Sequence, residues 1–480
     1  MGRRLPWNYF GFCDPLLSAG ALLKKTIRKA IVWPLLLLLV IICRYFYLSA
    51  SILTGYGAKN LCSAVFLQHR QAAEVIKNDL SGFPYALVSY ALNKTDSSAT
   101  ATLWGFARQK AIFRRNAGAA LVNDYNEADI RKQKINLPLP PFTDTDTLAW
   151  PYGDKLPDAL PSAIDTTLLQ QAFNKQFSKD NQTRALLVVY DGQVVAEKYA
   201  PGLNMYTPLQ GWSVSKSITA ALTGILVEQG KLDVNASGLL PQWQHTNKAG
   251  ITLRELLHQT SGIRYREEYL GPSEATTMLF KKGDMSGYIA ALPMEYMPGT
   301  VFNYSSGNAN LVSRIIRNAV APEDYYAFPY TSLLYPLGMY HTFLETDAGG
   351  TYVGSSYTYA TARDFARFGL LYYQNGCWNG KQLLPDHWVQ ASVQPFRADP
   401  LQHYGYFFWL NGRDKDHPDQ RWFPDVPSDM FFASGYLGQG IYIIPSKKLV
   451  VVRLGQRNVD ANQLLKDIIM AVSSKGGKSV

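Results

Sequence analysis

Residues 211–226 read GWSVSKSITAALTGIL, and they say more about this chain than any other stretch. After Ser213 the apolar side chains recur every three or four residues, which predicts a helix with one buried face. Gly230 is a suitable end for that helix. Ser213 and Lys216 stand three residues apart and therefore share a helix face. Ser213 also falls at the helix start, where free backbone N–H groups and the helix dipole favour a developing negative charge.

The spacing of Ser213 and Lys216 indicates a nucleophile and its base. A serine hydroxyl becomes a useful nucleophile only when a neighbouring base takes its proton. Lys216 can be that base, or can hold one in place, if partial burial lowers its pKa. The pair alone is weak evidence, because a helix-capping serine beside a solvated lysine has the same sequence. Three further segments strengthen the catalytic interpretation: ITLRELLHQTSGI (residues 251–263), PGTVFNYSSGN (residues 298–308) and ASGYLGQG (residues 433–440).

In this order, the four segments resemble the motifs of the serine β-lactamase and penicillin-binding-protein superfamily. The resemblance is closest to its class C-like branch of esterases, D-aminopeptidases and 6-aminohexanoate-dimer hydrolases, and it covers about residues 150–470. It implies a β-lactamase/transpeptidase-like fold and a serine hydrolase of the carboxylesterase or amidase type. The reaction that it implies runs through an acyl-enzyme.

The resemblance also implies a role for each matching position. Ser213 matches the family nucleophile, and Lys216 matches the lysine beside it. Tyr304 matches the tyrosine that relays the proton to the leaving group. The backbone N–H groups of Ser213 and Tyr436 match the oxyanion hole, which stabilises the tetrahedral intermediate. A tyrosine pKa of about 10 falls only beside positive charge, and Lys216 is the expected source.

Ser306, Ser434 and Gly435 match substrate-binding positions, but two departures from the family pattern alter the expected substrate. The family's second motif, matched here by residues 298–308, commonly ends in Asn, and this chain has Ser306. The third motif is matched by residues 433–440. In β-lactamases and D,D-peptidases it begins with a lysine that helps to bind the substrate carboxylate, and this chain has Ala433 at that position. We therefore expect small esters or amides that lack a carboxylate at that point, with Gly435 allowing the strand to approach the substrate closely. A D,D-peptidase or penicillin-recognising protein, and a non-catalytic binding module of the same fold, remain alternatives.

Strong hairpin signals lie on both sides of the motif region. The runs RALLVVY and QVVAEKY (residues 184–190 and 193–199) flank a two-residue Asp191-Gly192 turn. A second hairpin is predicted for residues 440–454, and an amphipathic helix for residues 462–473. Mostly helical sequence lies between the hairpins. The expected class is α+β: an antiparallel sheet flanked by helices, with a helical subdomain around residues 215–350 and a hydrolase domain over 151–480.

An accessory N-terminal region is predicted for residues 57–150, with a boundary in the proline-rich sequence near 137–160. Residues 57–92 indicate one or two helices, and residues 96–122 a short β-meander. This region either packs on the catalytic domain and shapes its cleft or acts as a spacer from the membrane. A separate aromatic run, YGYFFW (residues 404–409), either lines an acyl pocket or forms a packed core strand.

The chain begins with a basic segment followed by its most apolar stretch. Residues 1–44 carry seven basic side chains and one acidic one, which is more than half of the net charge of +10. The uncharged run AIVWPLLLLLVIIC (residues 30–43) leads to Arg44, which can snorkel to the far interface. We expect a single-pass signal anchor at residues 30–50, with residues 1–29 in the cytoplasm and the catalytic domain facing the periplasm from the inner (cytoplasmic) membrane. A cleaved signal peptide and a buried core helix are the alternatives.

The rest of the chain is nearly neutral, which argues against a nucleic-acid partner. The expected partners are the lipid bilayer and a small ester or amide, and the oligomeric state stays open. The seven histidines show no paired metal spacing and no phosphate-binding glycine loop is present, so no metal or cofactor is expected. His258 lies in an apolar helix and is expected to be structural. Cys62 and Cys377 would share the exported compartment, where a disulfide is conceivable but nothing local argues for it.

Overall fold

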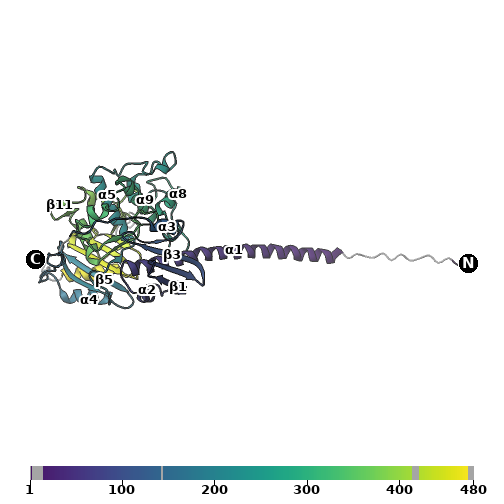
Figure 1. Cartoon of the computed structure of the whole chain (residues 1–480), viewed down its shortest axis with the longest axis horizontal. Coiled ribbons are helices and arrows are strands. Elements are labelled where there is room, and N and C mark those ends of the chain that lie inside the picture. Colours follow the sequence, from purple (N-terminus) through teal and green to yellow (C-terminus); the bar gives the residue numbers. More distant parts are fainter. Residues whose placement is uncertain (1, 3–14, 142–143, 413–420, 474–480) are drawn as a thin grey trace. The chain divides into compact units, whose positions relative to one another are not determined.

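The computed structural model describes residues 2, 15–141, 144–412 and 421–473 (Figure 1). The chain forms two compact units, Met1–Ala50 and Ser51–Val480. Helix α1 (Pro15–Phe66) supplies the first unit and continues into the second.

In the first unit, helix α1 exposes a continuous apolar surface. Its large hydrophobic side chains between Ile31 and Ile42 are 41–67% exposed. Among the described residues, Lys29–Phe66 is the stretch long and apolar enough to cross a membrane, by length and composition. The alternative of a buried core helix is therefore wrong, because these side chains are exposed. A signal anchor and a cleaved signal peptide are both compatible with this helix.

The second unit is built on a six-stranded antiparallel sheet. Its strands are β5 (Thr183–Tyr190), β6 (Gln193–Tyr199), β12 (Trp409–Leu410), β13 (Phe431–Gly435), β14 (Gln439–Ile444) and β15 (Leu449–Gly455). Their order in the sheet is β12-β13-β14-β15-β5-β6. Both predicted hairpins are confirmed as β5–β6 and β14–β15, and β15 pairs with β5, so that Val451 lies opposite Val188. This pairing joins the two ends of the hydrolase sequence.

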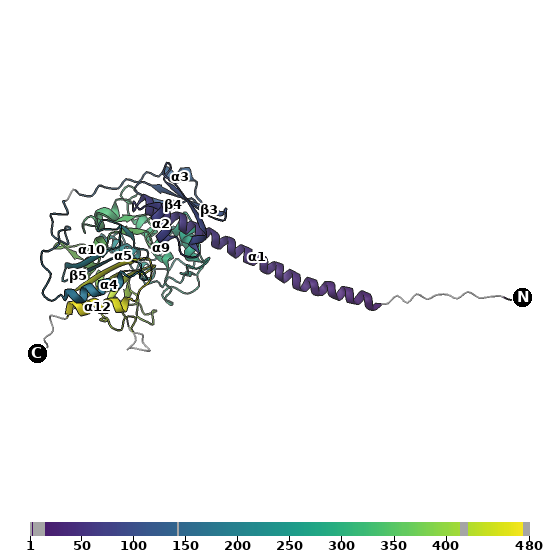
Figure 2. The ribbon, with the colours of Figure 1, turned by 90° about the horizontal axis from the view of Figure 1, so that it is seen from below.

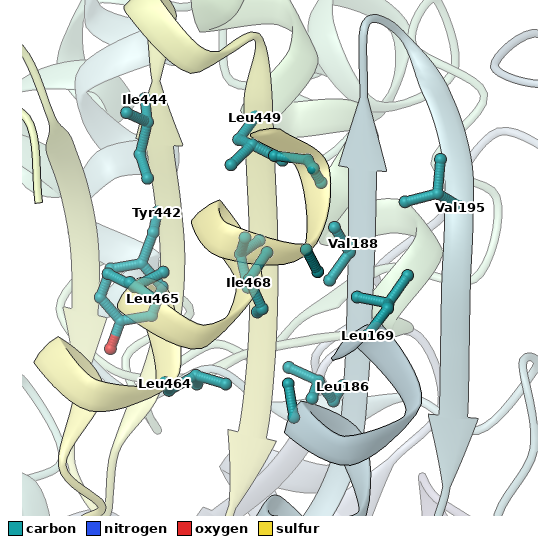
Figure 3. Packing of buried hydrophobic residues seen from close by; sticks show 14 of the residues in the cluster. Leu169, Leu186, Val188, Val195, Tyr442, Ile444, Leu449, Leu464, Leu465 and Ile468 are labelled. Carbon is teal, nitrogen blue, oxygen red and sulfur yellow. The ribbon is translucent and has the colours of Figure 1, made fainter. Parts of the chain in front are cut away.

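Helices cover both faces of this sheet, which explains its uninterrupted apolar strands. Helices α4 (Thr166–Gln176) and α12 (Ala461–Ser473) lie side by side on one face (Figure 2). There Ile468 packs among Leu186 and Val188 (Figure 3). Helix α10 (Ala362–Tyr373) covers the other face so closely that a side chain at Gly369 would strike Val450. Because successive strand residues point to opposite faces, a sheet covered on both sides needs apolar residues at nearly every position.

The predicted helical region between the hairpins is also present. Its helices are α5 (Val214–Glu228), α6 (Leu253–Leu257), α7 (Glu274–Lys281), α8 (Met285–Ala291), α9 (Ser306–Ala319) and the π-helix η3 (Tyr330–Leu334). Smaller elements complete the unit: η2 (Pro241–Trp243), β7 (Leu209–Gln210), β8 (Phe343–Leu344), β9 (Thr358–Ala360), β10 (Cys377–Trp378), β11 (Lys381–Gln382), α11 (Trp388–Ser392) and η4 (Pro445–Lys447). Helices α5 and α9 contact each other, which brings the first and second motifs together.

The N-terminal part of this unit carries a second, four-stranded sheet. The strands of this sheet are β1 (Val88–Asn93), β2 (Ser98–Leu103), β3 (Phe106–Arg114) and β4 (Gly118–Leu121). The same part of the chain contains α2 (Ala72–Asp79), η1 (Tyr85–Leu87) and α3 (Glu127–Arg131). The meander at residues 96–122 is confirmed. The helical prediction for residues 57–92 is wrong at its end, because Gly82 and Pro84 stop the helical sequence and the following residues pair as strand β1.

Residues 51–79 pack against the hydrolase part rather than extending away from it. Leu61 and Cys62 are fully buried. Lys59 forms a buried ion pair with Glu345, and Arg184 of strand β5 pairs with Asp79. These contacts mean that the N-terminal region can shape the surroundings of the active site.

Candidate active site

Ser213 occupies the N-cap position of α5 but does not use its side chain as a cap. Its Oγ lies 2.8 Å from Nζ of Lys216, one helical turn on. The preceding residue, Trp212, has a left-handed backbone (φ 49°), so the chain turns sharply just before the serine. The interpretation of this pair as a capping serine and a solvated lysine is therefore wrong, because the serine makes no capping bond and the lysine is buried.

Lys216 is enclosed by neutral oxygen atoms. Its side chain is 1% exposed, and Nζ lies 2.9 Å from Oγ of Ser306 and 3.3 Å from the carbonyl oxygen of Ser355. Burial disfavours the charged form and lowers the Lys216 pKa to about 8, although the carboxylate of Glu267 partly opposes this shift. A substantial fraction of the lysine is therefore neutral near physiological pH and able to accept a proton.

Tyr304 closes the other side of the pair. Its ring centroid lies 4.8 Å from Lys216 Nζ, its hydroxyl is hydrogen-bonded to Ser213, and its ring stacks on Trp409. Burial, with smaller contributions from Tyr404 and Glu267, raises the Tyr304 pKa well above its usual value. The expected lowering of the Tyr304 pKa by Lys216 is thus wrong, because desolvation of the phenolate dominates and the opposing contribution comes from the Ser213 hydrogen bond. The raised pKa favours the protonated phenol, which is suited to donate a proton.

Glu267 is a member of this cluster that sequence reasoning missed. Its carboxylate accepts hydrogen bonds from the backbone N–H (2.8 Å) and hydroxyl (2.5 Å) of Ser306, and from the hydroxyl of Tyr269 (2.5 Å). Ser306 is the first residue of helix α9, so the carboxylate also meets the positive end of the helix dipole. The one sequence signal for Glu267 was the charged run at residues 264–269, between the first and second motifs. Such a run is equally typical of a solvated loop.

Ser306, predicted to bind substrate, lies between Lys216 and Glu267 and is completely buried. Its hydroxyl accepts from the lysine and donates to the carboxylate. In this arrangement Ser306 connects the proposed base to an acidic group, while Ser213, Tyr304 and Glu267 are partly exposed.

The third motif meets the nucleophile turn through Gly435, at the end of strand β13. A Cβ atom at Gly435 would lie 2.1 Å from the carbonyl oxygen of Gly211, so only glycine permits this approach. The next residue, Tyr436, packs edge-on against Trp212 with ring centroids 5.5 Å apart. The side chain of Gln439 donates to the Tyr436 carbonyl at 2.8 Å and holds this turn in place. Ser434 precedes the glycine on β13 and is partly exposed.

Aromatic residues from the N-terminal region extend the surroundings of the nucleophile. Tyr56 of helix α1 stacks on Trp212 with parallel rings 6.1 Å apart, and on Tyr85 at 4.5 Å. On the other side, Tyr269 contacts Tyr436 with ring centroids 5.2 Å apart. The chain therefore surrounds its candidate nucleophile with rings from three regions that are far apart in sequence.

The aromatic run at residues 404–409 belongs mostly to the core. Tyr404, Tyr406, Phe407 and Phe408 are at most 2% exposed, as a packed segment requires, although only Trp409 begins a strand. Packing is therefore the main role of this run.

The remaining sequence predictions concern metal ligands, His258 and the cysteines. Within the described residues, no group of His, Cys, Asp and Glu side chains is arranged to hold a metal ion. His258 is buried against Phe396 and Tyr406. Cys62 and Cys377 are free thiols, so the suggested disulfide between them is not formed. Cys13 lies outside the described residues.

Comparison with known proteins identifies the family and the fold. The Beta-lactamase family model matches residues 171–472, which include all four motifs. The 6-aminohexanoate-dimer hydrolase of Paenarthrobacter ureafaciens is 23% identical over 296 residues, covering 58% of this chain and 74% of that protein. A penicillin-binding-protein homologue from Caulobacter crescentus shares the fold with a TM-score of 0.52 and 15% identity, over 67% of this chain and 100% of that one. A family VIII carboxylesterase does so with a TM-score of 0.51 and 14% identity, over the same shares.

Proposed function

Because the chain belongs to the beta-lactamase family, we propose that it is a serine hydrolase that cleaves a small ester or amide through an acyl-enzyme on Ser213. One observation carries this proposal: the Lys216 amine, buried and with its pKa lowered to about 8, lies 2.8 Å from the Ser213 hydroxyl. Lys216 faces hydroxyl groups and a carbonyl rather than a carboxylate, and one of those hydroxyls is that of Ser213.

The proposed reaction has two steps. Neutral Lys216 accepts the Ser213 proton while Oγ attacks the substrate carbonyl, and the backbone N–H groups of Ser213 and Tyr436 stabilise the resulting oxyanion. The C–O or C–N bond then breaks. Tyr304 donates its proton to the leaving group and is reprotonated from Lys216, which leaves the acyl-enzyme. Water attacks this ester with the same groups acting in reverse, which releases the acid and restores the serine.

The third motif supports a substrate without a carboxylate at the position that it contacts. Ala433 is buried and carries no charge, while Ser434 and Gly435 present a neutral strand end next to the nucleophile turn. We propose that these two residues form the binding side of the site, whereas Ser306, predicted to bind substrate, is completely buried and acts through its contacts with Lys216 and Glu267. The name of the Paenarthrobacter relative indicates an amide substrate, and this proposal extends amide cleavage, beside ester cleavage, to the present chain.

Hydrolysis of p-nitrophenyl butyrate by the full chain in detergent tests the proposal. The matched variants are Ser213→Ala and Ser217→Ala, since Ser217 is on the same helix but donates to the Phe407 carbonyl, away from Lys216. We expect the first to lose turnover and the second to keep it, and mass spectrometry to detect an acyl adduct on Ser213. Equal activity in both variants would refute the role of Ser213. Labelling of Ser213 by a fluorescent penicillin, without ester turnover, would instead favour a penicillin-recognising protein.

We also propose that residues 30–50 anchor the chain in the inner membrane, with residues 1–29 in the cytoplasm and the catalytic unit in the periplasm. The apolar exposed helix and the basic residues before it support this orientation. Protease digestion of spheroplasts should degrade the catalytic unit of the intact chain. Protection of that unit until the membrane is lysed would reverse the orientation.

A further inference from the structure

Three segments of the second unit meet at one end of its four-stranded sheet. In strand pairing, Val88 at the start of β1 lies opposite Leu103 at the end of β2, and Leu103 lies opposite Phe106 at the start of β3. The Thr54 hydroxyl of α1 donates to the carbonyl oxygen of Ala107 at 2.6 Å. The loop before β1, the β2–β3 hairpin and the first turns of α1 inside this unit therefore share one sheet end.

This sheet end exposes large apolar side chains. Phe83 and Leu87, in the segment before β1 that includes η1, are 85% and 41% exposed, and Trp104 and Phe106 on the β2–β3 hairpin are 61% and 70% exposed. We call these four residues the apolar rim. Single exposed hydrophobic residues are ordinary, but a group gathered from two separate loops marks a binding surface.

The chain itself indicates what the apolar rim meets. Thr54 follows Leu48, near the end of the apolar segment, by only six residues. These residues belong to helix α1, in which each residue advances about 1.5 Å, so Thr54 lies only about 9 Å further along the helix than Leu48 and the sheet end that it contacts is near the end of the apolar segment. Tryptophan and phenylalanine are side chains that enter the membrane interface, and the exposed Arg108 beside the hairpin can meet anionic headgroups.

We propose that the apolar rim docks on the bilayer surface from which the anchor emerges. This rests on the anchor proposed above and adds a second, peripheral contact to it. The contact also bears on the active site, because Tyr85, between Phe83 and Leu87, stacks on Tyr56, which stacks on Trp212 next to Ser213. Docking would therefore hold the aromatic surroundings of the nucleophile close to the lipid headgroups.

Quenching of tryptophan fluorescence by brominated lipids tests this proposal in vesicles that contain the full chain. Each tryptophan is assigned by the fluorescence lost in a Trp→Phe variant: Trp104→Phe reports the rim, and Trp33→Phe the anchor. Trp422→Phe is the control, since Trp422 is 50% exposed but lies beside strand β12. We expect the Trp104 component to be quenched by bromines placed near the headgroups, the Trp33 component by bromines placed deeper, and the Trp422 component by neither.

Two results would overturn the docking. A Trp104 component quenched by aqueous iodide but not by brominated lipid would show that the rim faces water. A component shielded from both would show that protein, such as a second copy of the chain, covers it. Failure of the anchor is distinguished from failure of the rim by the Trp33 component, which would then escape the deep bromines. A double variant, Phe83→Ser/Phe106→Ser, should move the Trp104 component from lipid quenching to iodide quenching.

Discussion

Two buried lysines in the catalytic unit have opposite environments. Lys216 is 1% exposed and faces the hydroxyls of Ser213 and Ser306. Lys59 is 3% exposed and forms an ion pair with Glu345, whose other oxygen accepts from the Ser63 hydroxyl at 2.9 Å. Both lysines are thus nearly fully buried, and they differ in the groups that their amines contact.

That difference separates the proposed catalytic base from a structural lysine. A buried charge is stable only when it is paired and hydrogen-bonded, as at Lys59. At Lys216 the Ser306 hydroxyl lies between the amine and the Glu267 carboxylate. The attraction of that carboxylate is therefore too weak to cancel the effect of burial, and the Lys216 pKa falls to about 8. The comparison shows how one intervening serine can leave a lysine able to lose its proton.

The largest expected effect comes from removing the reactive amine. Lys216→Ala should lower kcat/KM by about 10²–10⁴-fold, the usual contribution of a general base. Lys216→Arg should be nearly as poor, because a guanidinium keeps its proton. Both are measured by ester hydrolysis, with thermal unfolding to confirm a folded chain. An active arginine variant would mean that position 216 supplies only charge.

The structural lysine should behave in the opposite way. Lys59→Met leaves Glu345 buried without its partner and should lower the free energy of unfolding by about 3–5 kcal/mol. The kcat of the folded fraction should change little. Denaturant titration measures the first quantity, and active-site titration normalises the second. The double variant Lys59→Met/Glu345→Leu should recover much of the stability, whereas a double variant as unstable as the single one would contradict the ion-pair explanation.

The lowered Lys216 pKa predicts a pH dependence. Only the neutral amine accepts the serine proton, so kcat/KM should rise about tenfold per pH unit below pH 8 and level off above it. A pH–rate profile of the full chain checks this. A profile already flat from pH 6 upward would mean that Lys216 is not the titrating base.

Replacing Glu267 should have the smallest effect of these changes, and the effect should be a shift in the pH dependence of kcat/KM. Its carboxylate raises the Lys216 pKa, so Glu267→Gln should move the acid limb of kcat/KM to lower pH. Glu268→Gln is the matched control, since Glu268 is the exposed neighbour. A drop in kcat with no movement of the limb would reduce Glu267 to a structural role.

Local sequence predicted much of this architecture because its signals depend on near neighbours. The Asp191-Gly192 turn between two apolar runs was enough to predict β5–β6, and the recurrence of apolar residues after Ser213 was enough to predict α5. The same reasoning failed at β1, whose strand conformation depends on pairing with β2. The pairing of β15 with β5 joins segments more than 250 residues apart and has no local signal.

By itself, the sequence determined the family motifs, the apolar N-terminal segment, and Ser213 and Lys216 as a pair on one helix face. Only the tertiary structure decided that Lys216 is buried, that Ser306 separates it from Glu267, and that burial raises the Tyr304 pKa. It also brought Tyr56 from the N-terminal region against Trp212. The physical reason is that residue type and spacing are local properties, whereas desolvation and the distance between charges depend on every segment that packs around a group.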